Sequence, residues 1–340
     1  MNWYVKDALL RSNPPSLNAN PDLFQRHVYD RNRPETHEIC REIRAFVDAW
    51  PGDRVLIGEI FARDPSVAAS YHGNGSDELH MAFNMELLYV KWSARSFAKA
   101  LARWYGALPS GAWPNVTLSN HDQPRHATRF RTRNGAVSRA RMEIAAMLLL
   151  AARGTPFLYY GEEIGMTNAR IPRAEMQDPT GKTFWPLPVG RDGERTPMQW
   201  NGSANAGFTE DAARPWLRVA QDRESVNVAD ARRDAESLWH WYRALIELRR
   251  GSAALTSGDF AFLSRGERGV LSFVRSAEGG RAGKTERVAC CLNFSRSVRN
   301  VRLESGARVL LGNARPQGAV LGEGFTVLAP HEALLVGWEA

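Results

Sequence analysis

The sequence predicts an α/β region over residues 1–252, followed by an antiparallel β domain over residues 253–340. In the first region, short apolar runs alternate with stretches of helical periodicity, a pattern typical of βα units around a parallel sheet. From about Ala253 onward, short alternating segments are separated by Gly, Ser and Asn, which favours an antiparallel β-sandwich. The chain has 340 residues, 44% of them apolar, so both regions can bury a core.

The α/β region is expected to contain four strands and four main helices. The strands are expected at Val55–Gly58, Leu79–Phe83, Val116–Ser119 and Phe157–Tyr160, and the helices at Thr36–Trp50, Ser93–Tyr105, Val137–Arg153 and Ser237–Arg250. The first helix is amphipathic, with Ile39, Ile43, Phe46 and Val47 on one face. A closed (β/α)₈ barrel has eight strands in about 250 residues, so four βα units predict either a different open sheet or half of a barrel.

The β domain is expected to contain six strands. These are Phe260–Leu263, Val270–Val274, Val288–Phe294, Val298–Leu303, Ala307–Leu311 and Ala333–Trp338.

Composition and charge narrow the class of partner. The net charge is +7, but the cations are nearly all arginine and are spread along the chain, so no nucleic-acid partner is expected. The 11 Trp and 8 Tyr residues favour a sugar site over a phosphate groove. No apolar run reaches the length of about 18 residues that a membrane span needs, so no membrane partner is expected. Oligomeric state stays open.

The three cysteines predict neither a disulfide nor a metal site. Cys290 and Cys291 are neighbours in a predicted strand, where consecutive side chains point to opposite faces. Cys40 lies far away in the sequence, and no spacing typical of metal ligands occurs. Unpaired thiols fit a reducing compartment, so we expect a cytoplasmic protein.

The first candidate catalytic residue is Glu59. The stretch Arg54–Phe61, RVLIGEIF, predicts an apolar strand that ends at Gly58 and is followed directly by this carboxylate. The carboxyl end of a buried parallel strand is where barrel enzymes place their active groups. The alternative is a strand-end glutamate that points into water.

The second candidate position follows another strand. In Asn115–Arg125, NVTLSNHDQPR, an apolar strand is followed by Asn120, His121 and Asp122. Asn-His-Asp is also compatible with an ordinary turn and N-cap. Two strands that each end in a carboxylate nevertheless provide the groups that split a glycosidic bond, one to protonate the leaving oxygen and others to attack or stabilise an oxocarbenium-like centre.

A long connection supplies the third signal. The stretch Gly154–Gly165, GTPFLYYGEEIG, is followed by Gln177–Trp200, QDPTGKTFWPLPVGRDGERTPMQW. This connection is too long for a simple turn and rich in Trp, Arg and Asp, so we expect a loop that faces the substrate. A buttressing loop with internal salt bridges is the alternative.

In this order, GEIF, LSNHDQPR, GTPFLYYGEE and GRDGERTPMQW resemble the α-glucosidase and oligo-1,6-glucosidase branch of glycoside hydrolase family 13, the α-amylase superfamily. The resemblance extends over essentially the whole chain. It implies an α/β fold in which the chain forms the C-terminal half, strands 5–8, of a (β/α)₈ TIM barrel, followed by the β-sandwich. It also implies a small-molecule α-glucoside as substrate and no cofactor.

The resemblance implies roles for six residues. Glu59 is expected to be the general acid/base, Asp122 to stabilise the transition state, and His121 to hydrogen-bond the glucose. Three arginines are expected to bind sugar or balance charge: Arg125, Arg191 and Arg195. Which of Arg191 and Arg195 clamps the non-reducing end of the sugar stays open.

One family motif has no counterpart in the sequence. The family nucleophile is an aspartate in a Gly-Phe-Arg-x-Asp motif, and it would stand just before the stretch Asn2–Asp7. We therefore expect a chain that is truncated at its N-terminus, lacks the nucleophile and the first four barrel strands, and is inactive and aggregation-prone by itself. A Ca²⁺ site in the missing part stays open.

Three functions remain compatible with these motifs. The first is a hydrolase that releases α-glucose from maltose-type oligosaccharides with retention of configuration. The second is a relative that transfers glucosyl groups or isomerises sucrose or maltose with the same carboxylates. The third is a non-catalytic remnant or sugar-binding fragment.

Overall fold

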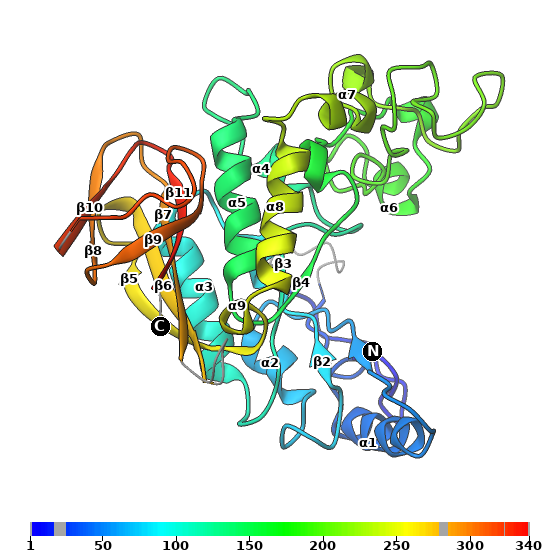
Figure 1. The fold of residues 1–340 in the computed structure, drawn as a ribbon. Helices are drawn as coiled ribbons and strands as arrows, with labels where there is room; N and C mark the ends of the chain where they lie inside the picture. The colour runs from blue at the N-terminus through cyan, green and yellow to red at the C-terminus, as the bar shows by residue number, and fades with distance from the viewer. Residues whose placement is uncertain (1, 17–24, 279–284, 323, 339–340) are drawn as a thin grey trace. The chain divides into compact units, whose positions relative to one another are not determined.

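The computed structural model describes residues 2–16, 25–278, 285–322 and 324–338. The chain divides into two compact units (Figure 1). The first comprises Met1–Tyr89 and Ala100–Asn115, and the second Val90–Lys99 and Val116–Ala340. Helix α3 (Ala94–Ala107) and strand β3 (Asn115–Thr117) contribute residues to both units. The predicted domain boundary at residues 252 and 253 lies inside the second unit, at the start of α9 (Ala253–Ser257).

The first unit contains the first two predicted strands. These strands are β1 (Ile57–Gly58) and β2 (Met81–Ala82). The unit also contains α1 (Pro34–Asp48), α2 (Pro65–Ser70) and η1 (Glu86–Leu88). Strands β1 and β2 pair in parallel, as expected for consecutive βα units, although each is shorter than predicted. A buried cluster that includes Cys40, Ile60, Tyr71 and Trp104 forms the core of this unit.

Helix α1 begins and ends close to the predicted positions, but its buried face differs from the prediction. The two buried residues of the helix are Thr36 and Cys40. Phe46, which was expected on the apolar face, is 65% exposed. It packs instead against Trp50, with the two ring centroids 6.1 Å apart in an edge-on arrangement. Contrary to the expectation, Phe46 is therefore not buried on the apolar face. Its contact is with Trp50, which lies just after the end of the helix.

The second unit begins with an α/β part. After β3 its elements are α4 (His126–Arg129), α5 (Arg139–Ala151), β4 (Thr155–Phe157), η2 (Glu162–Ile164), η3 (Arg173–Glu175), α6 (Pro179–Thr183), η4 (Gln221–Glu224), α7 (Val228–Arg233), α8 (Leu238–Arg250) and α9. Strand β3 pairs with β4. Helix α5 is buried on every side from Arg141 to Ala151. Helix α8 packs beside it, and the Trp241 indole of α8 donates to the Glu143 carbonyl of α5 at 3.1 Å.

The β domain contains all six predicted strands and one more. They are β5 (Asp259–Arg265), β6 (Val270–Ala277), β7 (Glu286–Asn293), β8 (Arg299–Leu303), β9 (Ala307–Gly312), β10 (Gly324–Leu328) and β11 (Ala333–Trp338). Strand β10 was not predicted, because its apolar residues Phe325 and Val327 are 65% and 52% exposed and follow no burial pattern. Strand β10 pairs only with β8, so it forms half of a two-stranded sheet.

The β domain is a two-sheet antiparallel sandwich. One sheet has the order β5-β6-β7-β11-β9, and the other is β10-β8. Buried residues of both sheets, including Cys291, Val301, Leu328 and Val336, form one core between them. Helices α5 and α9 pack against the five-stranded sheet (Figure 1).

The remaining structural expectations can be compared directly. All three cysteines are buried, and none forms a disulfide. In the ranges that the structure describes, no helix is long and apolar enough to cross a membrane.

Candidate active site

Glu59 lies in the first unit and follows β1 directly, as predicted. The residue is exposed, while its neighbours Gly58 and Ile60 are buried. Gly58 pairs with Ala82 of β2 in a parallel ladder. The backbone that carries Glu59 is therefore fixed by the pairing of β1 with β2, although Ile57 of β1 is 43% exposed, and the carboxylate is left accessible.

Asp122 follows β3 in the second unit, and a local turn fixes its backbone. The Asn120 side-chain oxygen accepts from the amides of Asp122 and Gln123 at 3.0 and 2.9 Å. The turn that the sequence allows as an alternative is therefore present, and it presents Asp122 to solvent. The Asp122 side chain is 24% exposed, and one His121 ring nitrogen lies 3.5 Å from its Oδ1.

Two arginines from the long connection meet at Asp122. Arg191 donates from Nη1 to Asp122 Oδ1 at 3.1 Å, and Arg195 donates from Nη2 to the same oxygen at 2.6 Å. Arg195 also donates from Nε to the His121 carbonyl at 2.7 Å. One carboxylate oxygen thus accepts two charge-assisted hydrogen bonds, a geometry that holds Asp122 in one orientation.

Two further aspartates of the connection hold Arg191 in place. Asp178 caps α6 and accepts from Arg191 Nε and Nη2 at 3.0 and 2.7 Å. Asp192 in turn accepts from the backbone amides of Gln177 and Asp178. Burial raises the pKa of Asp178, but the hydrogen bonds and charge of Arg191 outweigh it, so the pKa lies below its ordinary value. The connection is therefore a preorganised loop with internal salt bridges that also reaches Asp122.

Arg125 differs from the other two arginines because it is only 1% exposed. Its guanidinium donates to the carbonyls of Tyr160 and Glu194 at 2.5 and 2.8 Å, and it lies over the Tyr159 ring, 4.7 Å from the centroid. The Tyr159 hydroxyl donates to the same Glu194 carbonyl at 3.1 Å. Arg125 therefore connects the segment after β4 with the loop that carries Arg195.

Glu194 is a buried carboxylate next to this cluster, with 2% exposure. Burial raises its pKa from an ordinary value of 4.5 to about 7, against the opposing effects of Arg195, Arg125 and a hydrogen bond from Asn168. The Asn168 amide donates to Glu194 Oε2 at 2.8 Å, and its oxygen accepts from the Arg125 backbone amide at 2.8 Å. The charge of Glu194 therefore changes near neutral pH, directly beside the site.

We expect Glu194→Gln to flatten the pH dependence of stability. Between pH values of 4.5 and about 7 the folded state binds more protons than the unfolded state, so the free energy of unfolding falls as pH rises through this range. At pH 8 the glutamine variant should be more stable than the native protein by up to about 3 kcal/mol, and at pH 4 the two should be equal. Urea unfolding at several pH values measures this difference. An equal gain at pH 4 and pH 8 would contradict it.

The structure brings together four of the six predicted site residues around one carboxylate. They are His121, Asp122, Arg191 and Arg195, all in the second unit. Three supporting residues were not predicted, Asp178, Asp192 and Glu194. The Asp-Pro pair at Asp178 is a helix-start signal that predicts its capping role. No sequence signal distinguishes Glu194 from an exposed glutamate.

A strand-end carboxylate held by two arginines of a preorganised loop is an arrangement typical of enzyme sites at the carboxyl end of βα units. The model of the alpha-amylase catalytic domain matches residues 8–258. The chain therefore belongs to the alpha-amylase family, and its fold is the family's barrel followed by a β domain. Its relatives are glycoside hydrolases of the α-glucosidase type.

Individual relatives agree with this assignment. A probable alpha-glucosidase of Rhizobium meliloti is 33% identical over 100% of this chain and 60% of its own length, and an oligo-1,6-glucosidase of Heyndrickxia coagulans is 30% identical over 90% and 59%. Among solved structures, the alpha-glucosyl transfer enzyme XgtA superposes with a TM-score of 0.83 at 30% identity, covering 99% of this chain and 62% of its own. The trehalulose synthase MutB superposes at 0.78 with 27% identity, covering 89% and 59%. The chain thus spans about 60% of these relatives.

Proposed function

We propose that this chain carries acid/base and charge-stabilising residues of a retaining enzyme that cleaves α-glucosides and transfers the glucose to water. The observation that carries the proposal is the single oxygen of Asp122 that accepts from both Arg191 and Arg195. A carboxylate held in this way needs no reorganisation when positive charge develops on the sugar ring. The names of the curated relatives, alpha-glucosidase and oligo-1,6-glucosidase, support the same substrate class.

The roles follow from the chemistry of glycoside cleavage. Glu59 protonates the glycosidic oxygen as the aglycone leaves, and Asp122 stabilises the oxocarbenium-like transition state. His121 hydrogen-bonds the glucose, and Arg191 and Arg195 hold Asp122 and contact the sugar. Water then attacks the glucosyl intermediate and gives its proton to Glu59, which restores the acid. Arg125 is buried, so we assign it to supporting the loop.

The same proposal assigns β1 to β4 to the last four strands of the barrel. Retention requires a nucleophile about 5–5.5 Å from the acid/base. The Gly-Phe-Arg-x-Asp motif that carries it in the family is not in the sequence. We therefore propose that turnover depends on an aspartate from the region of the relatives that this chain does not span.

A second function is favoured by the structural neighbours, which include an alpha-glucosyl transfer enzyme and a trehalulose synthase. In that reading the same residues cleave the glycosidic bond, and the acceptor is a sugar hydroxyl instead of water. The position of the acceptor decides between the two functions.

The experiment is product analysis on maltose, isomaltose and sucrose. It compares the chain with a version extended by the N-terminal region of the probable alpha-glucosidase of Rhizobium meliloti that this chain does not span. We expect free glucose from maltose or isomaltose with the extended version and no turnover with the chain alone. Conversion of sucrose to an isomer with little free glucose would favour the second function. No turnover of any sugar by the extended version would overturn both and favour a non-catalytic sugar-binding protein.

A further inference from the structure

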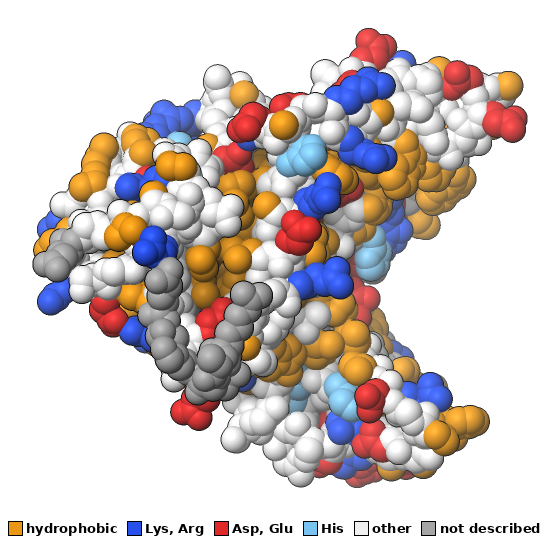
Figure 2. All heavy atoms as spheres, viewed as in Figure 1, with side chains coloured by type: hydrophobic (Ala, Val, Ile, Leu, Met, Phe, Trp, Pro, Cys, Tyr) orange, Lys and Arg blue, Asp and Glu red, His pale blue; other side chains and the backbone are white. Residues whose placement is uncertain are grey.

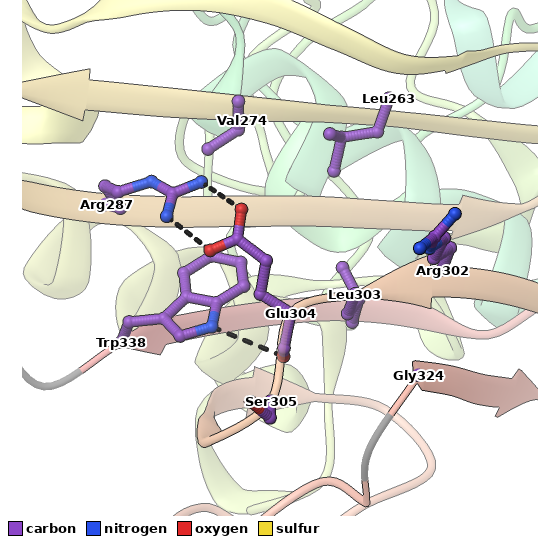
Figure 3. Close-up of a pocket in the computed structure, with 9 residues that line it drawn as sticks. All are labelled: Leu263, Val274, Arg287, Arg302, Leu303, Glu304, Ser305, Gly324 and Trp338. Carbon is purple, nitrogen blue, oxygen red and sulfur yellow. Dashed lines mark hydrogen bonds and ion pairs between the residues drawn. The ribbon is translucent and has the colours of Figure 1, made fainter.

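The C-terminal β domain contains a large cavity that the proposed active site does not use. It has a volume of about 640 Å³, which is within the range of small-molecule sites. Its lining comes from six strands of the sandwich and includes Leu263, Val274, Arg287, Leu303 and Trp338 (Figure 3).

The cavity exists because the two sheets of the sandwich differ in size. The two-stranded sheet β10-β8 faces a five-stranded sheet, and the shared core includes Val270 of β6 and Ala289 of β7. The two-stranded sheet does not extend over the edge strand β5. Leu263 of β5 is therefore 47% exposed and lines the cavity. An apolar floor is thus left open on the inner side of the sheet.

The polar groups of the cavity form a fixed set. Arg287 of β7 and Glu304, which follows β8, make a bidentate ion pair at 2.5 and 2.8 Å (Figure 3). The Arg287 guanidinium lies over the Trp338 ring, 5.0 Å from the centroid, and the Trp338 indole donates to the Glu304 carbonyl at 3.4 Å. An ion pair this exposed contributes only about 0–1 kcal/mol to stability, so its alignment beside the cavity is not required by the fold.

A second, smaller cavity of about 280 Å³ shares Leu263 and Arg302 with the first, so the two form one groove. Ser272 of β6 lines this smaller cavity. The residue is fully buried, yet its hydroxyl has no hydrogen-bond partner among the described residues. Because no surface of Ser272 is exposed, its hydroxyl lies beneath the groove, out of reach of a ligand bound there.

We propose that this groove binds a neutral oligosaccharide, and we infer a malto-oligosaccharide, a choice that rests on the proposed function. A pyranose presents apolar C–H faces, which fit Leu263, Val274 and Trp338, and vicinal hydroxyls, which both donate and accept. Arg287 offers donors and Glu304 offers acceptors side by side, which matches such a diol.

The lining of the groove carries charges of both signs, four arginines and two glutamates. On the face of the molecule drawn in Figure 2, Lys and Arg side chains lie among acidic and apolar ones and form no continuous cationic stripe. A binding groove for a polyanion would require such a stripe.

The test measures the affinity of the chain for maltohexaose by ligand-observed NMR, with cellohexaose and inorganic phosphate as comparison ligands. Glu304→Ala removes the acceptor and releases Arg287, and we expect at least about tenfold weaker binding of maltohexaose, as for loss of a hydrogen bond to a charged group. Glu224→Ala is the matched control, because Glu224 is also exposed and paired with an arginine. It should bind as the native protein does, and thermal melts should show that both variants are folded.

A further variant separates this groove from the proposed active site. Arg195→Ala disturbs the contact with Asp122 and should leave binding in the groove unchanged. Equal affinities of Glu304→Ala and Glu224→Ala, loss of binding in Arg195→Ala alone, or displacement by phosphate would each overturn the inference. Absence of sugar turnover by the extended version, with retained, Glu304-dependent binding, would defeat the proposed function and leave the groove in place.

Discussion

Replacement of Asp122 by asparagine is expected to lower the turnover of α-glucosides by on the order of 10³-fold or more in the catalytically complete protein. The substitution keeps the shape of the side chain and the backbone turn made by Asn120. It removes the negative charge that accepts from Arg191 and Arg195, so positive charge on the sugar ring would face Arg195 without its carboxylate partner and Arg191 paired with Asp178 alone. Both losses act on the transition state, so kcat should fall more than KM changes.

Steady-state kinetics on p-nitrophenyl α-glucoside measures this effect. Asp230→Asn is the matched control, because Asp230 is an exposed aspartate paired with Arg233 on α7. The control should retain native kinetics. If Asp122→Asn lost less than tenfold, the role assigned to Asp122 would be wrong, and the two arginines would then be the better candidates for a structural cluster.

The largest expected effect on stability is that of Arg275→Met. Arg275 lies on β6 and is fully buried. Its guanidinium donates to five backbone carbonyls, those of Ala151, Ala152, Leu255, Gly258 and Asp259, at 2.8 to 3.1 Å. Carbonyls at helix ends have no partner within the helix, so this one side chain satisfies the ends of α5 and α9 together.

Methionine fills much of the same volume but donates no hydrogen bond. The carbonyls would remain buried and unsatisfied, so we expect the free energy of unfolding to fall by at least about 3 kcal/mol. Equilibrium unfolding in urea measures the change, with Arg302→Met as the control, because Arg302 is an exposed arginine on β8. The control should change stability by less than about 0.5 kcal/mol. Equal stabilities of the two variants would show that water replaces the guanidinium at the helix ends.

The strands show which elements a local sequence pattern can predict and which it cannot. Apolar runs such as those around Val116 and Val270 predicted their strands, because burial on a sheet imposes the pattern directly. Strand β10 was missed because Phe325 and Val327 face outward, where burial does not constrain them. The prediction for Phe46 failed for a different reason. An apolar residue on a helix does not specify which segment will cover it, and Phe46 remains exposed.

For the candidate site, too, the sequence predicted some features and the structure alone showed others. The order of the motifs placed Asp122 and His121 after a strand and predicted that arginines of the long connection belong with them. The sequence did not show that Arg191 and Arg195 share one oxygen of Asp122, or that Arg125 is buried among Tyr159 and Tyr160. Three arginines with similar neighbours in the sequence thus have different environments.

By itself, the sequence determined the family of this protein, the order of its main strands and longer helices, and the residue types offered for glycoside cleavage. Periodicity and motif order follow from contacts between neighbours in the chain. Only the tertiary structure decided which charged groups are buried, as for Glu194, Arg125 and Arg275, and where the sandwich leaves a groove. Burial and cavity shape depend on segments distant in the chain, so the electrostatics of a residue emerge when those segments meet.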